Sequence, residues 1–135
     1  MILDKNPHFN SAIILPSATR SSKPIECDLA RTLTVSARCI YNASGTESAL
    51  INVYYSPDGK HIDTIAYTYW ENTITAGAAV QRTQLIDPPE AGYLIFRVTN
   101  QDTVYNITRV KLWINVSRYW EDLHAAMSSY NATRR

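Results

Sequence analysis

Apolar and polar residues alternate most regularly over residues 92–116, the stretch around which we expect the chain to be organised. Its first half has an apolar residue at every second position, namely Leu94, Phe96 and Val98. After a polar turn at residues 100–102, its second half repeats the pattern with Val110, Leu112, Ile114 and Val116. Successive strand side chains point to opposite faces, so each row can face a core. The stretch therefore predicts two strands that form a central hairpin.

Weaker alternation occurs in the rest of the chain, at residues 9–15, 25–29, 32–41, 51–55, 62–70 and 79–86. Turn residues separate these segments. In one turn, Pro57 presets its own backbone angle and Gly59 accepts the positive φ that follows. About eight short strands with turn signals roughly every ten residues indicate an all-β, antiparallel β-sandwich. A jelly roll with two Greek keys fits this strand count.

The last residues show a helical period instead. Ser117 is a suitable N-cap, and apolar residues recur three or four positions apart at Trp120, Leu123, Met127 and Tyr130. A short docked helix and a frayed tail both fit this pattern. We therefore divide the chain into an N-terminal arm or edge strand at 1–20, a β-sandwich domain at 21–116 and a C-terminal helix or tail at 117–135.

Composition and charge limit the classes of partner. The formal net charge is +1, and no basic run is longer than the terminal Arg134-Arg135, so we expect no nucleic-acid-binding surface. No apolar stretch approaches the roughly 20 residues of a membrane span, so we expect no membrane contact. Asp4, Lys5 and Asn6 interrupt any apolar run near the N-terminus, so we expect no signal peptide there.

Side chains that carry chemistry are few and scattered. The two cysteines, Cys27 and Cys39, fall in neighbouring predicted strands; two buried free thiols are favoured, and a disulfide stays open. The three histidines lie in different segments, at His8, His61 and His124. A nucleophile needs a base beside it, and no phosphate-loop, zinc or hydrolase motif is present. We therefore expect no catalytic residue, no cofactor and no enzymatic activity.

A metal site has one weak candidate. Asp58 and Asp63 flank the predicted turn and could share a calcium ion together with carbonyl groups. Calcium takes roughly six to eight oxygen ligands, and two carboxylates supply few of them. The favoured interpretation is that Asp58 shapes the turn and Asp63 faces solvent, with no metal bound.

Aromatic side chains are the strongest candidates for contact with a partner. The chain has nine Tyr and three Trp against two Phe, and Tyr and Trp are residues that anchor interfaces. Trp120 in the tail is one candidate. A platform for a protein or a sugar would use Tyr54, Tyr67, Tyr69, Trp70 and Trp113. The alternative is that most of these side chains fill the core or cover the outside of a sheet.

Two further groups of residues suggest contacts. The N-terminal arm would reach a neighbouring subunit through Phe9, Ile13 and Leu15, unless it forms an edge strand of its own sandwich. Cations lie on or near the outward face of the central hairpin, at Arg97, Arg109 and Lys111. Pairing with acids of the same sheet is the ordinary explanation for these cations, and contact between subunits is the alternative.

Three stretches together carry a family resemblance: residues 53–59 (VYYSPDG), 89–94 (PEAGYL) and 98–102 (VTNQD). Their layout resembles small β-sandwich proteins of tailed viruses of bacteria and archaea, over about residues 21–116. That resemblance implies a protein that decorates a capsid or forms part of a head-to-tail or tail structure. The SPDG turn is also similar to discoidin-like and other carbohydrate-binding sandwiches. Neither resemblance assigns a binding residue.

Three functional hypotheses follow. The first is a structural subunit of the virion, a homo-oligomer that works by contact with itself and with other particle proteins. The second is a carbohydrate- or surface-binding module. The third is an extracellular filament subunit in which residues 1–15 donate a strand. The second and third would place the protein outside the cell.

Overall fold

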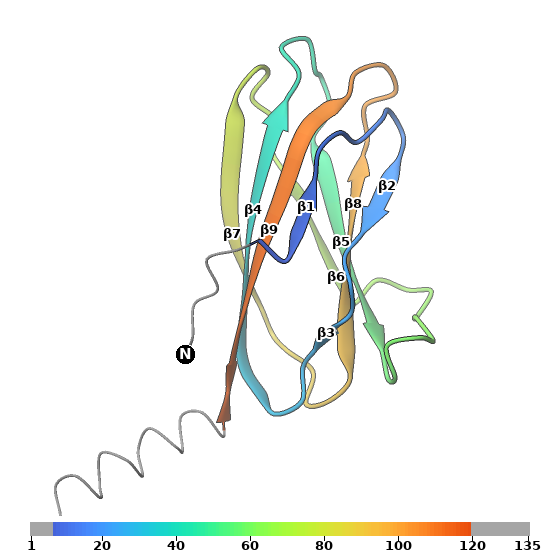
Figure 1. The fold of residues 1–135 in the computed structure, drawn as a ribbon, viewed down its shortest axis with the longest axis vertical. Helices are drawn as coiled ribbons and strands as arrows, with labels where there is room; N and C mark the ends of the chain where they lie inside the picture. Colours follow the sequence, from blue (N-terminus) through green and yellow to red (C-terminus); the bar gives the residue numbers. More distant parts are fainter. Residues whose placement is uncertain (1–6, 120–135) are drawn as a thin grey trace, which may run out of the picture.

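The protein folds as two stacked antiparallel β-sheets (Figure 1). This computed structural model describes residues 7–119. Sheet 1 contains, in spatial order, β1 (Phe9–Ser11), β9 (Ile107–Arg118), β4 (Ala30–Tyr41) and β7 (Ala79–Ile86). Sheet 2 contains β2 (Thr19–Ser21), β8 (Tyr93–Asn100), β5 (Ala49–Ser56) and β6 (Thr68–Asn72), with β3 (Ile25–Glu26) also paired to β8. The predicted all-β antiparallel sandwich is therefore confirmed.

The core lies between the two sheets and is built from the alternating rows. The inward residues of both sheets are buried, including Leu33, Val35, Ile51, Val53, Leu94, Phe96, Val98, Val110, Leu112 and Ile114. Burying a side chain of this size contributes roughly 1.5–3 kcal/mol relative to leaving it exposed. Within residues 7–119, no helix has the length and apolarity that crossing a membrane requires.

The buried Tyr41 joins the two sheets at their upper end. Its hydroxyl accepts a hydrogen bond from the backbone N–H of Ala49 at 3.0 Å and donates one to the backbone carbonyl of Asn72. Burial raises the pKa of the Tyr41 phenol, so the hydroxyl stays protonated and can donate. One side chain of β4 thus fixes the position of β5 and β6 across the core.

The expected central hairpin is wrong, because β8 and β9 belong to different sheets. β8 pairs with β5, and β9 pairs with β4. Residues 101–106 cross from one sheet to the other, and their backbone is held by the carboxylate of Asp102. This carboxylate accepts hydrogen bonds from the backbone N–H groups of Thr46, Val104 and Tyr105 at 2.9, 2.9 and 3.0 Å. The two apolar rows therefore face each other across the core instead of lying in one sheet.

The strand expected at residues 62–70 is shorter, since β6 begins at Thr68. A loop precedes it, and Asp58 organises its start by accepting hydrogen bonds from the backbone N–H groups of Lys60 and His61 at 2.9 and 2.8 Å. Gly59 has a φ of 80°, the conformation expected for it in this turn. The turn interpretation of Asp58 therefore agrees with the geometry.

The N-terminal segment folds onto its own sandwich. β1 pairs with β9, Ile14 is buried and bridges to Ile107, and β2 pairs with β8. The segment thus passes from sheet 1 to sheet 2, as the edge-strand alternative describes, and it does not extend away as an arm.

At the other end of the chain, β9 continues through Arg118. Ser117, expected to be an N-cap, is instead a strand residue paired with Thr32. The rest of the expected helix from Trp120 onward lies outside the described residues.

Candidate functional site

The five aromatic residues expected to form one platform lie in four places. Tyr54 and Tyr69 are on the outer side of sheet 2, whereas Trp70 is only 6% exposed and points into the core. Trp113 is half-buried on the outer side of sheet 1. Tyr67 precedes β6, and its hydroxyl donates to the backbone carbonyl of Asp87 at 2.6 Å. Only Tyr54 and Tyr69 therefore share a face.

These two tyrosines belong to a surface that we call the tyrosine face, the outer side of sheet 2. Strand register sets its composition. On β5, Asn52 stands between Tyr69 of β6 and Arg97 of β8. In the next row, Leu50 stands between Glu71 and Thr99. Since neighbouring strands are about 4.8 Å apart, an aromatic ring, an amide, a guanidinium and a carboxylate lie within a few strand spacings. The tyrosine face comprises Leu50, Asn52, Tyr54, Tyr69, Glu71, Ile95, Arg97 and Thr99.

Contacts within the tyrosine face orient its polar side chains. The guanidinium of Arg97 lies 4.7 Å from the centre of the Tyr54 ring, a cation–π contact that leaves its N–H groups able to donate. Gln101 donates to the carboxylate of Glu71 at 3.1 Å and to the backbone carbonyl of Ser48 at 2.8 Å. These contacts hold Tyr54 and Glu71 in place before any ligand arrives.

Tyr69 is the most accessible aromatic residue of the tyrosine face, with 70% of its surface exposed. It offers a ring surface that is not covered by the protein, while its neighbours offer both donors and acceptors of hydrogen bonds. The tyrosine face therefore suits a ligand that combines a flat C–H surface with hydroxyl groups. Among the described residues, no group of three or more His, Cys, Asp or Glu residues could hold a metal ion.

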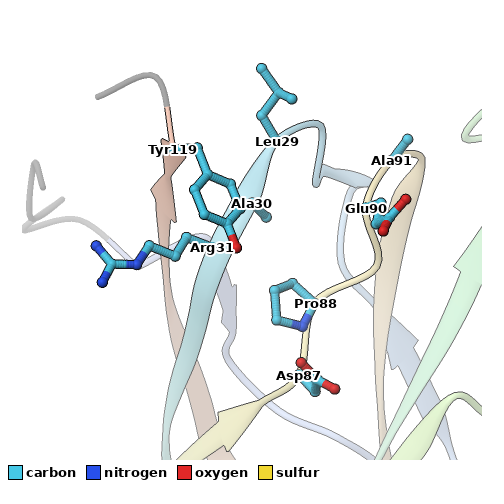
Figure 2. A pocket seen from close by; sticks show the side chains of 8 residues that line it. All are labelled: Leu29, Ala30, Arg31, Asp87, Pro88, Glu90, Ala91 and Tyr119. Carbon is cyan, nitrogen blue, oxygen red and sulfur yellow. The ribbon is translucent and has the colours of Figure 1, made fainter. Parts of the chain in front are cut away.

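A second candidate is a cavity of about 560 Å³, shown in Figure 2, at the end of the sandwich that is lower in Figure 1. Leu29 and Tyr119 stand at its rim, and the backbone N–H of Tyr119 donates to the carbonyl of Leu29 at 3.0 Å. Leu29 has a φ of 58°, which is uncommon for a residue with a branched side chain. In Figure 2, Arg31 extends away from the acidic residues. The lining residues are Leu29, Ala30, Arg31, Asp87, Pro88, Glu90, Ala91 and Tyr119.

Sequence reasoning did not find this cavity, nor Asn52 and Glu71 of the tyrosine face. Local sequence patterns indicate which types of residue point outward, but they do not indicate which strands become neighbours. Asn52 and Glu71 look like ordinary outward polar residues until register places them beside Tyr69 and Leu50. The cavity likewise joins segments that are far apart in the sequence. Because residues 25–29 alternate as in a strand, the sequence did not indicate the sharp turn of the backbone at Leu29.

Of the histidines that the structure describes, one contacts the backbone of a strand and the other contacts an acid in a turn. Nδ1 of His8 accepts a hydrogen bond from the backbone N–H of Ile114 at 3.1 Å. Nδ1 of His61 lies 2.5 Å from a carboxylate oxygen of Asp58. Hydrogen bonds from the backbone and side chain of His61 and from the backbone of Lys60 hold the pKa of Asp58 below its usual range. His124 lies outside the described residues.

Both cysteines are free thiols buried in the core, as favoured above. Burial raises the pKa of Cys27 to about 11 and also raises the pKa of Cys39. Since the thiolate is the reactive form, both sulfurs behave as small apolar groups near neutral pH.

The three cations expected on one hairpin are separated. Arg97 is on sheet 2, whereas Arg109 and Lys111 face outward on sheet 1.

Neither the known family models nor the curated proteins include a match to this chain. Among solved structures, it is similar to a family 16 carbohydrate-binding module, with 12% identity and a TM-score of 0.51 over 78% of this chain and 72% of that one. It also matches the CBM22-1–GH10 modules of Clostridium thermocellum xylanase 10B complexed with xylohexaose, with 18% identity and a TM-score of 0.49, over 68% of this chain. The match spans 18% of that xylanase chain.

A third match is a family 35 carbohydrate-binding module from an environmental isolate, with 12% identity and a TM-score of 0.47 over 87% of each chain. At these identities the likeness concerns the fold. The first of the three matches supports the β-sandwich described above. The expected virion resemblance is not tested by these matches and stays a prediction.

Proposed function

We propose that this protein is a non-catalytic binding module that holds a carbohydrate chain on its tyrosine face. The observation that carries the proposal is the position of Tyr69, an exposed ring in register with Asn52 and Arg97. A sugar ring has C–H surfaces that can lie on an aromatic ring, and its hydroxyls can both donate to and accept from the neighbouring polar groups. The fold likeness to a family 16 carbohydrate-binding module supports this ligand class.

The test is a glycan array probed with the full chain, followed by calorimetry with an oligosaccharide that binds. We expect Tyr69→Ala to weaken binding about tenfold, the effect of losing roughly 1.4 kcal/mol at a contact anchored by one aromatic side chain. Tyr119→Ala is the matched control, because it removes another exposed tyrosine at the rim of the cavity. A chain that binds no glycan would contradict the proposal. Loss of binding in Tyr119→Ala but not in Tyr69→Ala would indicate that the glycan binds in the cavity.

The second candidate function is the structural subunit of a virus particle, and one surface favours it. Four exposed apolar residues lie on the β1–β2 and β8–β9 connections, which Figure 1 shows at the upper end of the sandwich: Ile13, Leu15, Val104 and Tyr105. Asn100 brings these connections together by donating to the backbone carbonyls of Leu15 and Tyr105 at 3.3 and 2.9 Å. Exposed apolar groups that cluster in this way are typical of contact surfaces.

Sedimentation and electron microscopy of the full chain test this candidate. Contact through the upper connections predicts oligomers or particles that dissociate in Leu15→Glu and Val104→Glu, because each change places a charge in an apolar contact. The matched control is Leu85→Glu, an exposed leucine on the outer side of sheet 1. A chain that stays monomeric at high concentration and does not associate with particles would contradict a subunit role.

A further inference from the structure

Charge is divided unequally between the two sheets. The four strands of sheet 1 contain no Asp or Glu, but they contain six cations: Arg31, Arg38, Arg82, Arg109, Lys111 and Arg118. The strands of sheet 2 contain two cations and two acids: Arg20, Arg97, Glu26 and Glu71. The formal charge of the strands is therefore +6 in one sheet and zero in the other. The chain as a whole has a net charge of only +1, so this is a local feature.

Three of these cations lie together on the outer side of sheet 1, which we call the cationic face. Arg38 of β4 is the direct cross-strand partner of Lys111 of β9, and Arg109 is two residues before Lys111 on the same side. Like charges at directly opposed positions of a sheet are destabilising. Arg109 donates to the side-chain oxygen of Asn10 at 2.7 Å, a neutral partner. No carboxylate within the strands of sheet 1 offsets the Arg38–Lys111 pair.

Hydroxyl groups and an indole lie beside these cations. In the row beside them, Ser36 stands between Trp113 and Thr83, and its hydroxyl lies 2.8 Å from that of Thr83. The three cations lie on β4 and β9, the two middle strands of sheet 1. Small hydroxyl groups, a half-buried indole and three cations suit a linear ligand that carries repeated negative charges and ring surfaces.

We infer that the cationic face binds an anionic polysaccharide, whose carboxylate or sulfate groups contact Arg38, Arg109 and Lys111. This site is independent of the tyrosine face, because the two lie on the outer sides of opposite sheets. Either site can therefore be removed without removing the other.

The experiment measures binding of the full chain to polygalacturonate, which supplies carboxylates, and to heparin, which supplies sulfates. The variant Arg38→Gln/Lys111→Gln should bind the preferred polymer about tenfold more weakly, since two charge contacts at the surface together contribute roughly 1–2 kcal/mol. Added salt should weaken binding by the wild-type chain more steeply than binding by the variant. Circular dichroism verifies that each variant is folded, and Arg38→Gln alone provides a milder change.

The matched control is Arg20→Gln/Lys60→Gln, which removes the same charge from exposed positions outside sheet 1. We expect its affinity to stay within about twofold of the wild-type value, well below the effect of a lost contact. Equal losses in the two double variants would overturn the inference, because only net charge would then matter. Failure of both polymers to bind, or binding of single-stranded DNA or an acidic protein in their place, would also overturn it. Tyr69→Ala should leave binding of the anionic polymer unchanged.

Discussion

Tyr69 and Trp70 are adjacent in the chain and have opposite surroundings. Strand geometry sends neighbouring side chains to opposite faces, so the two cannot belong to one platform. Pairing decides which of them is inside: Trp70 is the cross-strand partner of the buried Ile51, whereas Tyr69 is the partner of Asn52. Trp70 is therefore a core residue, and a substitution there would affect folding before it affected any ligand.

We predict that Trp70→Ala lowers the free energy of unfolding by about 3–5 kcal/mol, the range for truncating a buried large aromatic residue. Tyr69→Ala should change it by no more than about 0.5 kcal/mol, because its side chain is exposed. Urea denaturation followed by circular dichroism measures both values. Similar losses in the two variants would show that Tyr69 is part of the packing.

The carboxylate of Asp102 should make stability depend on pH. Hydrogen bonds from the backbone of Thr46, Tyr105 and Val104 hold its pKa below its usual range. A folded-state pKa below the unfolded value of about 3.9 means that this stabilisation is complete above that pH and is lost as the pH falls through the folded-state value. We predict that Asp102→Asn is less stable than the wild type at neutral pH and that the difference shrinks in acid.

Equilibrium unfolding of the two proteins between about pH 7 and about pH 2 measures this difference. The matched control is Asp63→Asn, which changes another carboxyl group in a loop. It should alter stability little at any pH. A gap between wild type and Asp102→Asn that stays constant in acid would mean that the charge of the carboxylate does not contribute.

At the scale of elements, the sequence pattern predicted which side of each strand is buried better than it predicted which strands pair. The inward rows of β4, β5 and β8 are buried as expected, and β7 spans the predicted residues 79–86. The expected hairpin of β8 and β9 was wrong, because alternation says which side of a strand is apolar and nothing about which strand lies beside it. Residues 101–106 are long enough to cross between sheets about 10 Å apart, so the polar turn fits either arrangement.

The N-terminal segment gives a prediction at this scale. Deleting residues 1–15 removes β1 and the fully buried Ile14, and it leaves the backbone of β9 unpaired at an edge. We expect a loss of at least about 2 kcal/mol in stability, the lower end for truncating a buried Ile, together with a tendency to self-associate through the new edge.

Denaturation and size-exclusion chromatography of the deletion variant measure these two effects. Ile13→Ala is the matched control, because Ile13 is adjacent to Ile14 but is 52% exposed. Unchanged stability after deletion would mean that the segment does not support its own sandwich, and would favour a role in contact with another subunit.

At the scale of the whole molecule, the candidate surfaces arise only when strands from distant parts of the chain meet. The sequence identified Tyr54, Tyr69, Arg109 and Lys111 as outward candidates, yet it could not assign them to two separate faces. The tyrosine face needs β5, β6 and β8 in one sheet, and the cationic face needs β4 beside β9. Both depend on the crossing between sheets at residues 101–106, which no local pattern encodes.

The single core shared by the sheets leads to a last prediction. Leu112 of sheet 1 and Phe96 of sheet 2 belong to one buried cluster, and Tyr41 hydrogen-bonds from one sheet to the other. Leu112→Ala should lower stability by about 2–5 kcal/mol and Phe96→Ala by about 3–5 kcal/mol. In each variant one cooperative transition should move as a whole, with calorimetric and van't Hoff enthalpies in agreement. Two separate transitions in scanning calorimetry, each moved by one variant only, would show that the sheets unfold independently.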